Sequence, residues 1–251
     1  MDFLKDMKIV HLEAFKKSFK SFKRNWQIVL IGFLYSFLYS KVFRIMGELF
    51  LLKGLRIIAG LLLAIVMTSL TSNYLFLLSN IIRYDKFTLE NFKEGFKFYF
   101  RKVYSVFFVT WIARLLIGYI GNNVGPYSEA FYTVVSILIF IGLNPLPETI
   151  YQKYYSAYES IAYSFEFMKG NWFNWLLPNI IFGLILYKLS GVVLSNVITK
   201  KIEYNFFIFQ QGHFILNQIL ISYIMIYRGH LFNILSNSTR RKRLYMQKLN
   251  D

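Results

Sequence analysis

Five polar residues interrupt the apolar stretches of this sequence and could together bind a polar solute. They are Arg114, Lys188, Gln210, His213 and Asn217. Arginine and lysine carry positive charge, and histidine and the amides offer hydrogen-bond donors and acceptors, so the set suits an anionic or polar solute. Polar side chains inside a bilayer are costly, which makes them functional candidates. Their spacing by three and four residues places Gln210, His213 and Asn217 on one helix face.

The same residues also have a purely structural explanation. Arg114 and Lys188 could extend to the outer headgroups, and Gln210 and Asn217 could form hydrogen bonds between helices. Glu129, near the outer end of a neighbouring apolar stretch, is the acidic partner that we expect for Arg114. Both explanations stay open for Arg114, whereas the structural one is favoured for Lys188.

Catalytic and metal-binding motifs of soluble enzymes are missing. The sequence has no HExxH, no P-loop, no GxSxG and no cysteine. His11, His213 and His230 lie far apart in sequence and do not have the spacing of a metal site. We therefore predict that the protein is not an enzyme and has no metal or cofactor.

The elements that must position these residues are apolar blocks of membrane-spanning length. The chain is 56% hydrophobic and only 17% charged, against about 25% charged residues in soluble domains. Because the blocks are continuous rather than alternating, they predict helices, and the fold class is all-α integral membrane. Six transmembrane helices are expected, at about 26–43, 56–82, 103–120, 130–147, 172–197 and 205–227. The NPLP sequence at 144–147 predicts a kink in the fourth, and a cleaved signal peptide is not expected.

The distribution of basic residues predicts the orientation of the chain. Of the 29 lysine and arginine residues, 21 lie on the inner side if the N-terminus is inside, and six lie on the outer side. This asymmetry predicts that both termini are cytoplasmic and that the protein resides in the plasma membrane. The net charge of +16 is then explained by anionic lipid headgroups, and no nucleic acid partner is predicted.

An internal repeat organises the six expected spans. Glu13, Ser18, Phe19, Phe22, Asn25 and Trp26 align with Glu90, Gly95, Phe96, Tyr99, Lys102 and Val103, and with Glu159, Ser164, Phe165, Met168, Asn171 and Trp172. Each unit reads as an amphipathic surface helix followed by two crossing helices, which predicts three parallel hairpin repeats. We expect a single membrane domain over 1–251, with units at about 9–82, 86–148 and 155–232 and a basic cytoplasmic tail at 233–251.

Basic and aromatic residues mark the expected membrane interface. They are Lys16, Lys20, Lys23, Trp26, Lys169, Trp172, Arg240, Arg241, Lys242 and Arg243. The sequences KRNW at 23–26 and KGNW at 169–172 are each predicted to form a hinge, where a surface helix turns into the membrane and tryptophan anchors it. The surface helices are expected to lie among the headgroups or to pack beneath the bundle.

The stretches SFKSFKRNWQIVLIGF and SFEFMKGNWFNWLLPNIIFG resemble those of several families of uncharacterised bacterial six-helix membrane proteins. These families include the membrane domain of some glycerophosphodiester phosphodiesterases. The resemblance implies the repeated surface-helix and hairpin fold and a bacterial plasma membrane location. It brings no catalytic residues with it.

Two functions follow from these patterns. The first is a transport or export component for a polar or anionic solute, supported by the repeat and by the buried polar residues. The alternative is a non-transporting membrane scaffold or lipid-proximal accessory protein, working with a partner subunit through its basic helices. A water-filled cavity that reaches Arg114 and His213 would favour transport, and a dry, close-packed bundle there would favour the alternative.

Overall fold

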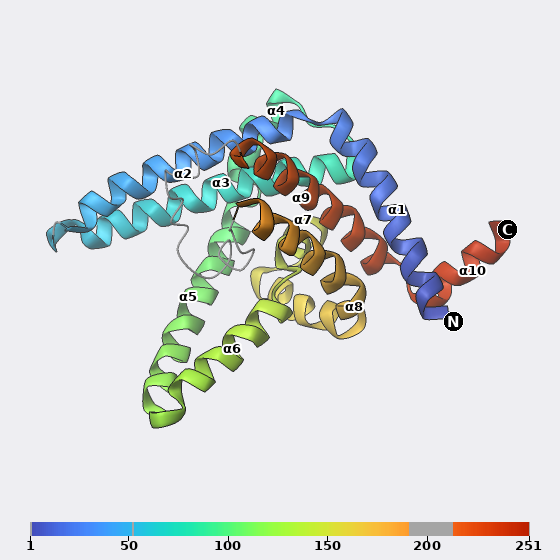
Figure 1. Cartoon of the computed structure of the whole chain (residues 1–251). Coiled ribbons are helices and arrows are strands. Elements are labelled where there is room, and N and C mark those ends of the chain that lie inside the picture. Colours follow the sequence, from blue (N-terminus) through green and yellow to red (C-terminus); the bar gives the residue numbers. More distant parts are fainter. Residues whose placement is uncertain (1, 52, 191–212, 251) are drawn as a thin grey trace. The chain divides into compact units, whose positions relative to one another are not determined.

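The structure is a computed structural model that describes residues 2–51, 53–190 and 213–250, and this part of the chain is all-helical (Figure 1). The helices are α1 (Asp2–Arg24), α2 (Gln27–Leu51), α3 (Arg56–Tyr84), α4 (Leu89–Phe98), α5 (Phe100–Asn123), α6 (Ser128–Gly142), α7 (Leu146–Gln152), α8 (Ala157–Ser190), α9 (His213–Asn237) and α10 (Arg240–Asn250). Short 3₁₀ turns at Lys53–Leu55 and Gly125–Tyr127 precede α3 and α6.

Within the described residues, six helical segments are long and apolar enough to cross a membrane. They are Gln27–Leu49, Ile57–Tyr84, Phe100–Asn123, Gly125–Gln152, Ala157–Leu189 and Ile215–Asn237. The prediction of six long apolar helices is therefore confirmed for the described residues. The break between α6 and α7 also confirms the kink predicted at NPLP, because Pro145 cannot donate the next helical hydrogen bond.

The helix of the sixth expected span extends nearly three turns further at its inner end than the sequence indicated. The prediction ended it at 227, but α9 continues to Asn237, and residues 205–212 lie outside the described part of the chain. Arg228 and His230 looked like the start of a polar tail in the sequence. Both are buried in the structure, so protein contacts replace water around their polar groups.

The chain divides into two compact units. The first contains residues 1–40, 77–91 and 170–251, and the second contains residues 41–76 and 92–169. The helices α2, α3, α4 and α8 each contribute residues to both units.

In the first unit, α1 lies beside α9 (Figure 1). The face of α1 that is buried consists of small and polar residues at steps of three and four: Val10, Ala14, Ser18, Ser21 and Asn25. Small residues allow two helix backbones to approach closely, and serine and asparagine can form hydrogen bonds across the contact. The large apolar residues of α1 lie elsewhere on its surface, since Leu12, Phe15, Phe19 and Trp26 are exposed.

A side-chain hydrogen bond network shapes the turn between α1 and α2. The Asn25 amide donates to the carbonyl oxygens of Ser21 (2.9 Å) and Asp85 (3.0 Å). Asp85 follows the last residue of α3 with a left-handed φ of 56°, a conformation that aspartate tolerates and that ends helices. The helix break predicted at the first K-x-N-W sequence is therefore present, since α1 ends at Arg24 and α2 begins at Gln27.

The second K-x-N-W sequence does not form a hinge, and that prediction is wrong. The helix α8 runs without interruption through Lys169, Gly170 and Trp172. A single glycine costs a helix only about 1 kcal/mol, which does not end it. The break at Asn25 needs its side chain to bond to another segment, and spacing along the sequence does not reveal that contact.

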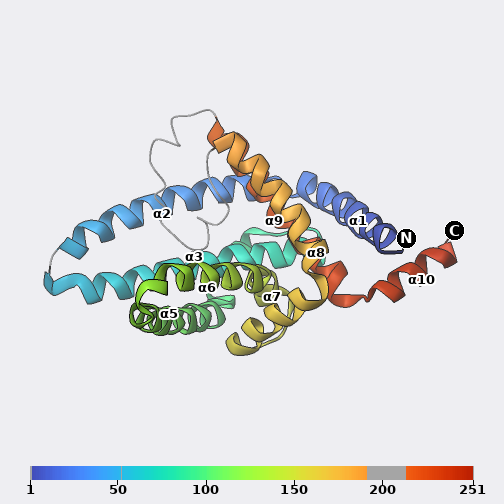
Figure 2. The same cartoon turned by 60° about the horizontal axis from the view of Figure 1, so that its bottom comes forward.

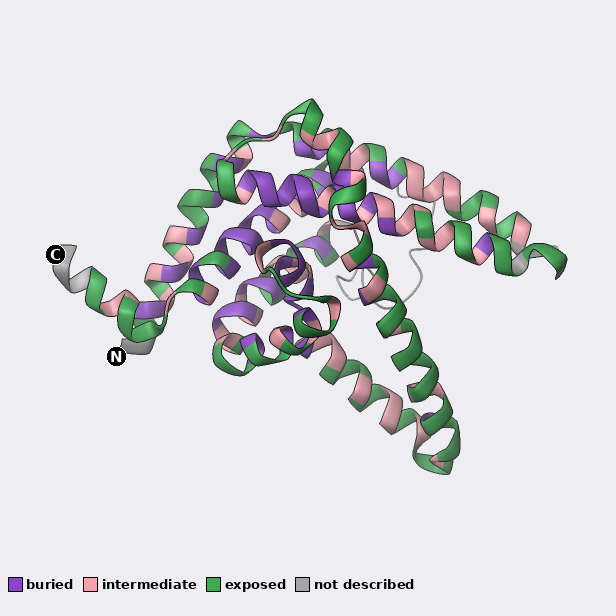
Figure 3. Ribbon diagram, turned by 180° about the vertical axis from the view of Figure 1, so that it is seen from behind, coloured by how far each residue is buried: buried purple, intermediate pink, exposed green. Residues whose placement is uncertain are grey.

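The second unit is built around a close contact between α3 and α4. A Cβ atom placed on Gly95 would lie 3.1 Å from the Asn73 Cα atom. The Ser72 hydroxyl donates to the Gly95 carbonyl (2.7 Å) and accepts from the Tyr99 backbone N–H (3.0 Å). In the same unit, α5 and α6 form a hairpin (Figure 2), and α5 is exposed along most of its length (Figure 3).

Replacing Gly95 with leucine is expected to destabilise the protein by about 1–3 kcal/mol, because the new side chain meets the backbone of α3. The measurement is chemical unfolding in mixed micelles, followed by tryptophan fluorescence. Gly118→Leu is the matched control, since Gly118 is also helical and a Cβ atom placed on it would have no described neighbour within 4 Å. Equal effects of the two substitutions would contradict a close α3–α4 contact.

Candidate functional site

The polar residues singled out in the sequence do not form one described site. Arg114 is exposed on α5 in the second unit, whereas Lys188 is exposed on α8 in the first. Gln210 lies outside the described residues, and so does the side chain of His213, at which α9 begins. The structure describes both Arg114 and Glu129, and both are exposed.

Amides in α9 are buried, and one of them bonds to another helix. The Gln218 side chain donates to the Ser36 hydroxyl on α2 (2.8 Å). Next to it, Asn217 is buried and its Oδ1 atom has no hydrogen-bond partner among the described residues. An interhelical bond of the kind that the structural explanation expected is made by Gln218, the residue after Asn217.

A polar seam joins α1 to α9, and we define it by His11, Ser18, Ser21, Tyr223, Tyr227 and His230. His11 Nδ1 lies 2.8 Å from the Tyr227 hydroxyl, and the Ser18 hydroxyl donates to Tyr223 (3.2 Å). Burial lowers the pKa of His11, and the negative charge of Asp6 partly opposes this. The seam thus holds a histidine in its neutral form more firmly than water would.

Ser21 is the junction of the polar seam with the end of α3. Its hydroxyl donates to Asp85 Oδ1 (2.5 Å), and His230 Nε2 lies 3.1 Å from the Ser21 Oγ atom. A hydroxyl has one proton, so the His230 nitrogen must donate while Ser21 donates to the carboxylate. Arg24 completes the cluster through an ion pair with Asp85 (3.2 Å). In a catalytic triad the carboxylate orients the histidine, whereas here it accepts from the serine, so the order does not suit a nucleophile.

A buried arginine in α9 is the residue that sequence reasoning missed. Arg228 is only 8% exposed. Its Nη1 atom donates to the Asn179 side chain on α8 (2.9 Å), and its guanidinium lies 5.0 Å from the centre of the Trp175 ring. The sequence carried one signal for it. Trp175 and Asn179, the two side chains that contact Arg228, are four residues apart and therefore lie on one helix face within an expected span.

The two terminal helices of the first unit are joined by a buried ion pair. Arg243 Nε and Nη2 donate to the two oxygens of Asp6 at 2.7 and 2.8 Å. The Asp6 side chain is fully buried and that of Arg243 is 9% exposed. Arg240 also approaches Asp6, with its Nε atom at 3.8 Å. Arg243 therefore differs from the neighbouring Arg240, because its guanidinium is buried and donates two hydrogen bonds to the Asp6 carboxylate.

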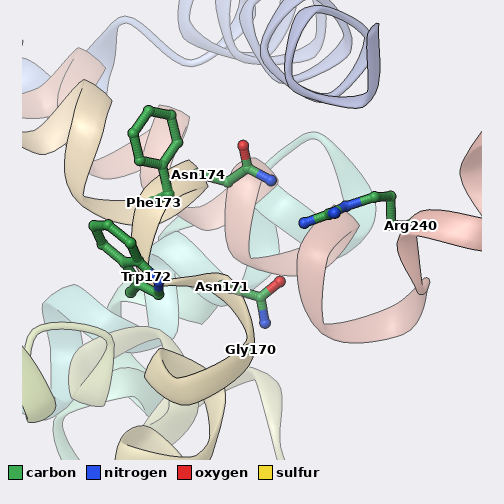
Figure 4. A pocket seen from close by; sticks show the side chains of 6 residues that line it. All are labelled: Gly170, Asn171, Trp172, Phe173, Asn174 and Arg240. Atoms are coloured by element: carbon green, nitrogen blue, oxygen red, sulfur yellow. The ribbon is translucent and has the colours of Figure 1, made fainter. Parts of the chain in front are cut away.

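A small pocket of about 120 Å³ lies in the first unit where α8 faces the start of α10. Gly170, Asn171, Trp172, Phe173, Asn174 and Arg240 line it. Figure 4 shows Asn171, Asn174 and the Arg240 guanidinium pointing toward one another. Asn174 is 5% exposed, and its Oδ1 atom has no hydrogen-bond partner in the described part of the chain. Two residues of the expected interface set, Trp172 and Arg240, therefore meet at one cavity.

Metal-ligating side chains are dispersed across the part of the chain that the structure describes. There, no three histidine, aspartate or glutamate side chains gather in a way that could hold an ion.

Comparison with known proteins gives no family to which these sites can be referred. The resemblance to bacterial six-helix membrane proteins stays a prediction. No family model, no curated protein and no solved structure matches this chain.

Proposed function

We propose that this chain is a multi-pass plasma membrane protein that serves as a non-transporting, lipid-proximal scaffold or accessory subunit. The observation that carries the proposal is the division of α1 into three faces. One face packs on α9, a second presents large apolar side chains to the surroundings, and a third presents lysines.

The chemistry of the three faces suits a helix at the boundary of lipid and water. Phe15 and Phe19 are 53% and 58% exposed, which is unfavourable in water but favourable in lipid. At 3.6 residues per turn, this face lies about 120° from the packed face. Lys16, Lys20 and Lys23 are exposed on the third face, where each contributes about 1 kcal/mol toward an anionic surface.

The orientation follows from the same helix. With α1 at the inner leaflet, its lysines reach the anionic cytoplasmic headgroups, and both termini lie in the cytoplasm of a bacterial cell. A partner subunit would then be met at this inner surface. Neither the polar seam nor the pocket has the order of groups that acid–base or nucleophilic catalysis needs, which supports a role other than that of an enzyme.

The three-hairpin repeat is part of the proposal, and equivalent contacts at aligned positions support it. Ser18 bonds to Tyr223 of α9, and the aligned Ser164 lies 3.3 Å from the Thr149 hydroxyl of α7. The aligned Gly95 accepts from Ser72 of α3. Gly95 and Ser164 thus each contact the helix that comes just before their own repeat. Ser18 belongs to the first repeat, and it contacts α9, the last helix of the third repeat.

A second set of aligned residues supports the repeat in the same way. Asn25 donates to the carbonyl of Asp85, just past the end of α3. Lys102, which aligns with it, donates to the carbonyls of Ile150 (2.8 Å) and Lys153 (3.0 Å) at the end of α7. Both side chains therefore satisfy carbonyls at the inner end of the second helix of their own hairpin, where a helix leaves them without partners.

Transport or export of a polar or anionic solute is the second candidate function, and Arg228 favours it. A buried arginine within a span is costly and suits an anion path. Its contacts with Asn179 and Trp175 also suit a structural role, in which α8 and α9 are held together. The two functions differ in whether water reaches the interior of α9.

Single cysteines test the proposal, because the chain has none of its own. Phe19→Cys, Lys20→Cys and Ser222→Cys would be exposed to a charged thiol reagent in nanodiscs, which leave both membrane faces open. We expect Lys20→Cys to react fast, and both Phe19→Cys, protected by lipid, and Ser222→Cys, buried at 1% exposure, to react at least tenfold more slowly.

Each position has its own contradicting outcome. Equal rates at the neighbouring positions 19 and 20 would reject a lipid-facing aromatic side of α1. A rate at Ser222→Cys within threefold of that at Lys20→Cys would show a water path along α9, and would favour transport over the scaffold role. Serine and cysteine are nearly the same size, so the Ser222 variant leaves the packing of α9 unchanged.

A further inference from the structure

We propose that the pocket formed by α8 and the start of α10 binds the phosphate of a phospholipid headgroup that also carries a hydroxyl or ammonium group. The inference rests on the membrane location in the proposed function and names a ligand for one site at that surface. The pocket is separate from the polar seam and shares no residue with it.

The basic side of the pocket is supplied by Arg240. Its guanidinium points toward the two asparagines across the cavity (Figure 4), and its Nε atom lies 3.8 Å from Asp6. That ion pair helps to orient the side chain, which is about half exposed. A planar guanidinium is well suited to phosphate, because it can donate two parallel hydrogen bonds to neighbouring oxygens.

The opposite side of the pocket carries a buried hydrogen-bond acceptor that has no described donor. Asn174 is nine-tenths buried, and its Oδ1 atom is an acceptor with no partner among the residues that the structure describes. Buried acceptors are almost always satisfied in folded proteins, and an exception points to a missing water or ligand. A half-turn of the Asn174 amide exchanges its oxygen and nitrogen and brings Oδ1 to the side of Arg240. A hydroxyl or ammonium group beside the phosphate would then satisfy Oδ1 while the phosphate lies on Arg240.

Size and position narrow the ligand to a small headgroup. A volume of about 120 Å³ accommodates a phosphate with a short polar extension, since one water occupies roughly 30 Å³ of liquid. The exposed Trp172 lines the same pocket, and tryptophan is enriched where headgroups meet lipid chains. Phosphatidylethanolamine and phosphatidylglycerol combine the required groups, and so does free glycerol 3-phosphate.

Native mass spectrometry of the full chain in neutral detergent tests the site. Phosphatidylethanolamine, phosphatidylglycerol and diacylglycerol would be added separately, and the bound fraction measured. We expect the two phospholipids to be retained and diacylglycerol, which has no phosphate, to be lost. Arg240→Gln and Asn174→Leu should each lower phospholipid retention about tenfold, the usual effect of losing a hydrogen bond to a charged or buried group.

Arg241→Gln is the matched control, because Arg241 is the next residue of α10, is exposed and does not line the pocket. It should retain phospholipid like the unmodified chain. Equal retention by Arg240→Gln, Asn174→Leu and the unmodified chain would overturn the proposal, as would retention of diacylglycerol. Arg243 still binds Asp6 in the Arg240 variant, and Asn174→Leu keeps the same branched arrangement of side-chain heavy atoms, so melting temperatures should confirm that both variants fold.

Glycerol 3-phosphate separates a lipid ligand from a soluble one. If millimolar glycerol 3-phosphate raises the melting temperature of the unmodified chain but not of Arg240→Gln, the same phosphate site serves a soluble ligand. If only phospholipids have this effect, the ligand is a lipid. The pocket variants could retain phospholipid like the unmodified chain while lipid still protects Phe19→Cys from the thiol reagent. That result would reject the headgroup site and leave the proposed function standing.

Discussion

Replacing Asp6 with alanine is expected to lower the free energy of unfolding by about 3–5 kcal/mol, because it leaves the buried Arg243 guanidinium without its carboxylate. Both oxygens of Asp6 accept from Arg243, at 2.7 and 2.8 Å, and the carboxylate is fully buried. Removing one partner of such a pair costs far more than the pair contributes, since the remaining charge has already lost its water. The expected consequence is that α10 separates from α1.

Unfolding in mixed micelles, monitored by tryptophan fluorescence, measures this loss. The double variant Asp6→Leu with Arg243→Met should recover most of the stability, because it removes both charges and keeps apolar volume in their place. Glu13→Ala is the control, since Glu13 forms an ion pair with Lys17 (2.6 Å) that is about half exposed. Exposed pairs of this kind contribute about 0.5 kcal/mol. An effect of Asp6→Ala as small as that of Glu13→Ala would contradict a structural role for the buried pair.

The membrane spans could be predicted from the sequence because their signal is local. Continuous apolar blocks and the NPLP break each depend only on residues close together in the chain, and the described residues contain six helices long and apolar enough to cross a membrane. The inner end of the sixth span could not be placed in the same way. Arg228 is polar by residue type, and only its contacts with Asn179 and Trp175 make burial acceptable.

The sequence carried only a weak hydropathy signal for the face of α1 that packs on α9. Hydropathy gives most weight to the large aromatic residues of α1, such as Phe15 and Phe19. The structure packs the face that carries Ala14 and Ser18 against α9 and leaves the aromatic residues exposed. Small residues have weak hydropathy, yet they decide which faces of two helices can approach.

Most contacts of the candidate sites join residues that are distant in the chain. Asp6 and Arg243 are separated by 237 residues, and Ser21 and His230 by 209. Spacing rules operate within one helix, so they grouped Arg243 with the neighbouring basic residues of the tail. For the same reason the sequence indicated Trp172 and Arg240 as interface residues but not the pocket that they share.

Trp175→Ala is expected to lower the free energy of unfolding by about 3–5 kcal/mol, the usual cost of removing a large buried aromatic side chain. Trp175 is fully buried. Its ring lies 6.0 Å from that of Phe232 and 5.0 Å from the Arg228 guanidinium. The substitution therefore leaves a cavity between α8 and α9 and also removes the aromatic face on which a buried cation rests.

Trp172→Ala is the matched control, because it removes the same side chain from the same helix less than one turn away. Trp172 is 56% exposed, so its loss should change the stability in detergent by less than about 1 kcal/mol. Unfolding of both variants in one micelle system gives the comparison. If Trp172→Ala proved as destabilising as Trp175→Ala, then Trp172 would be a core residue, and its assignment to the membrane interface would fail. A large difference would instead show that α8 carries a core tryptophan and an exposed tryptophan within a single helical turn.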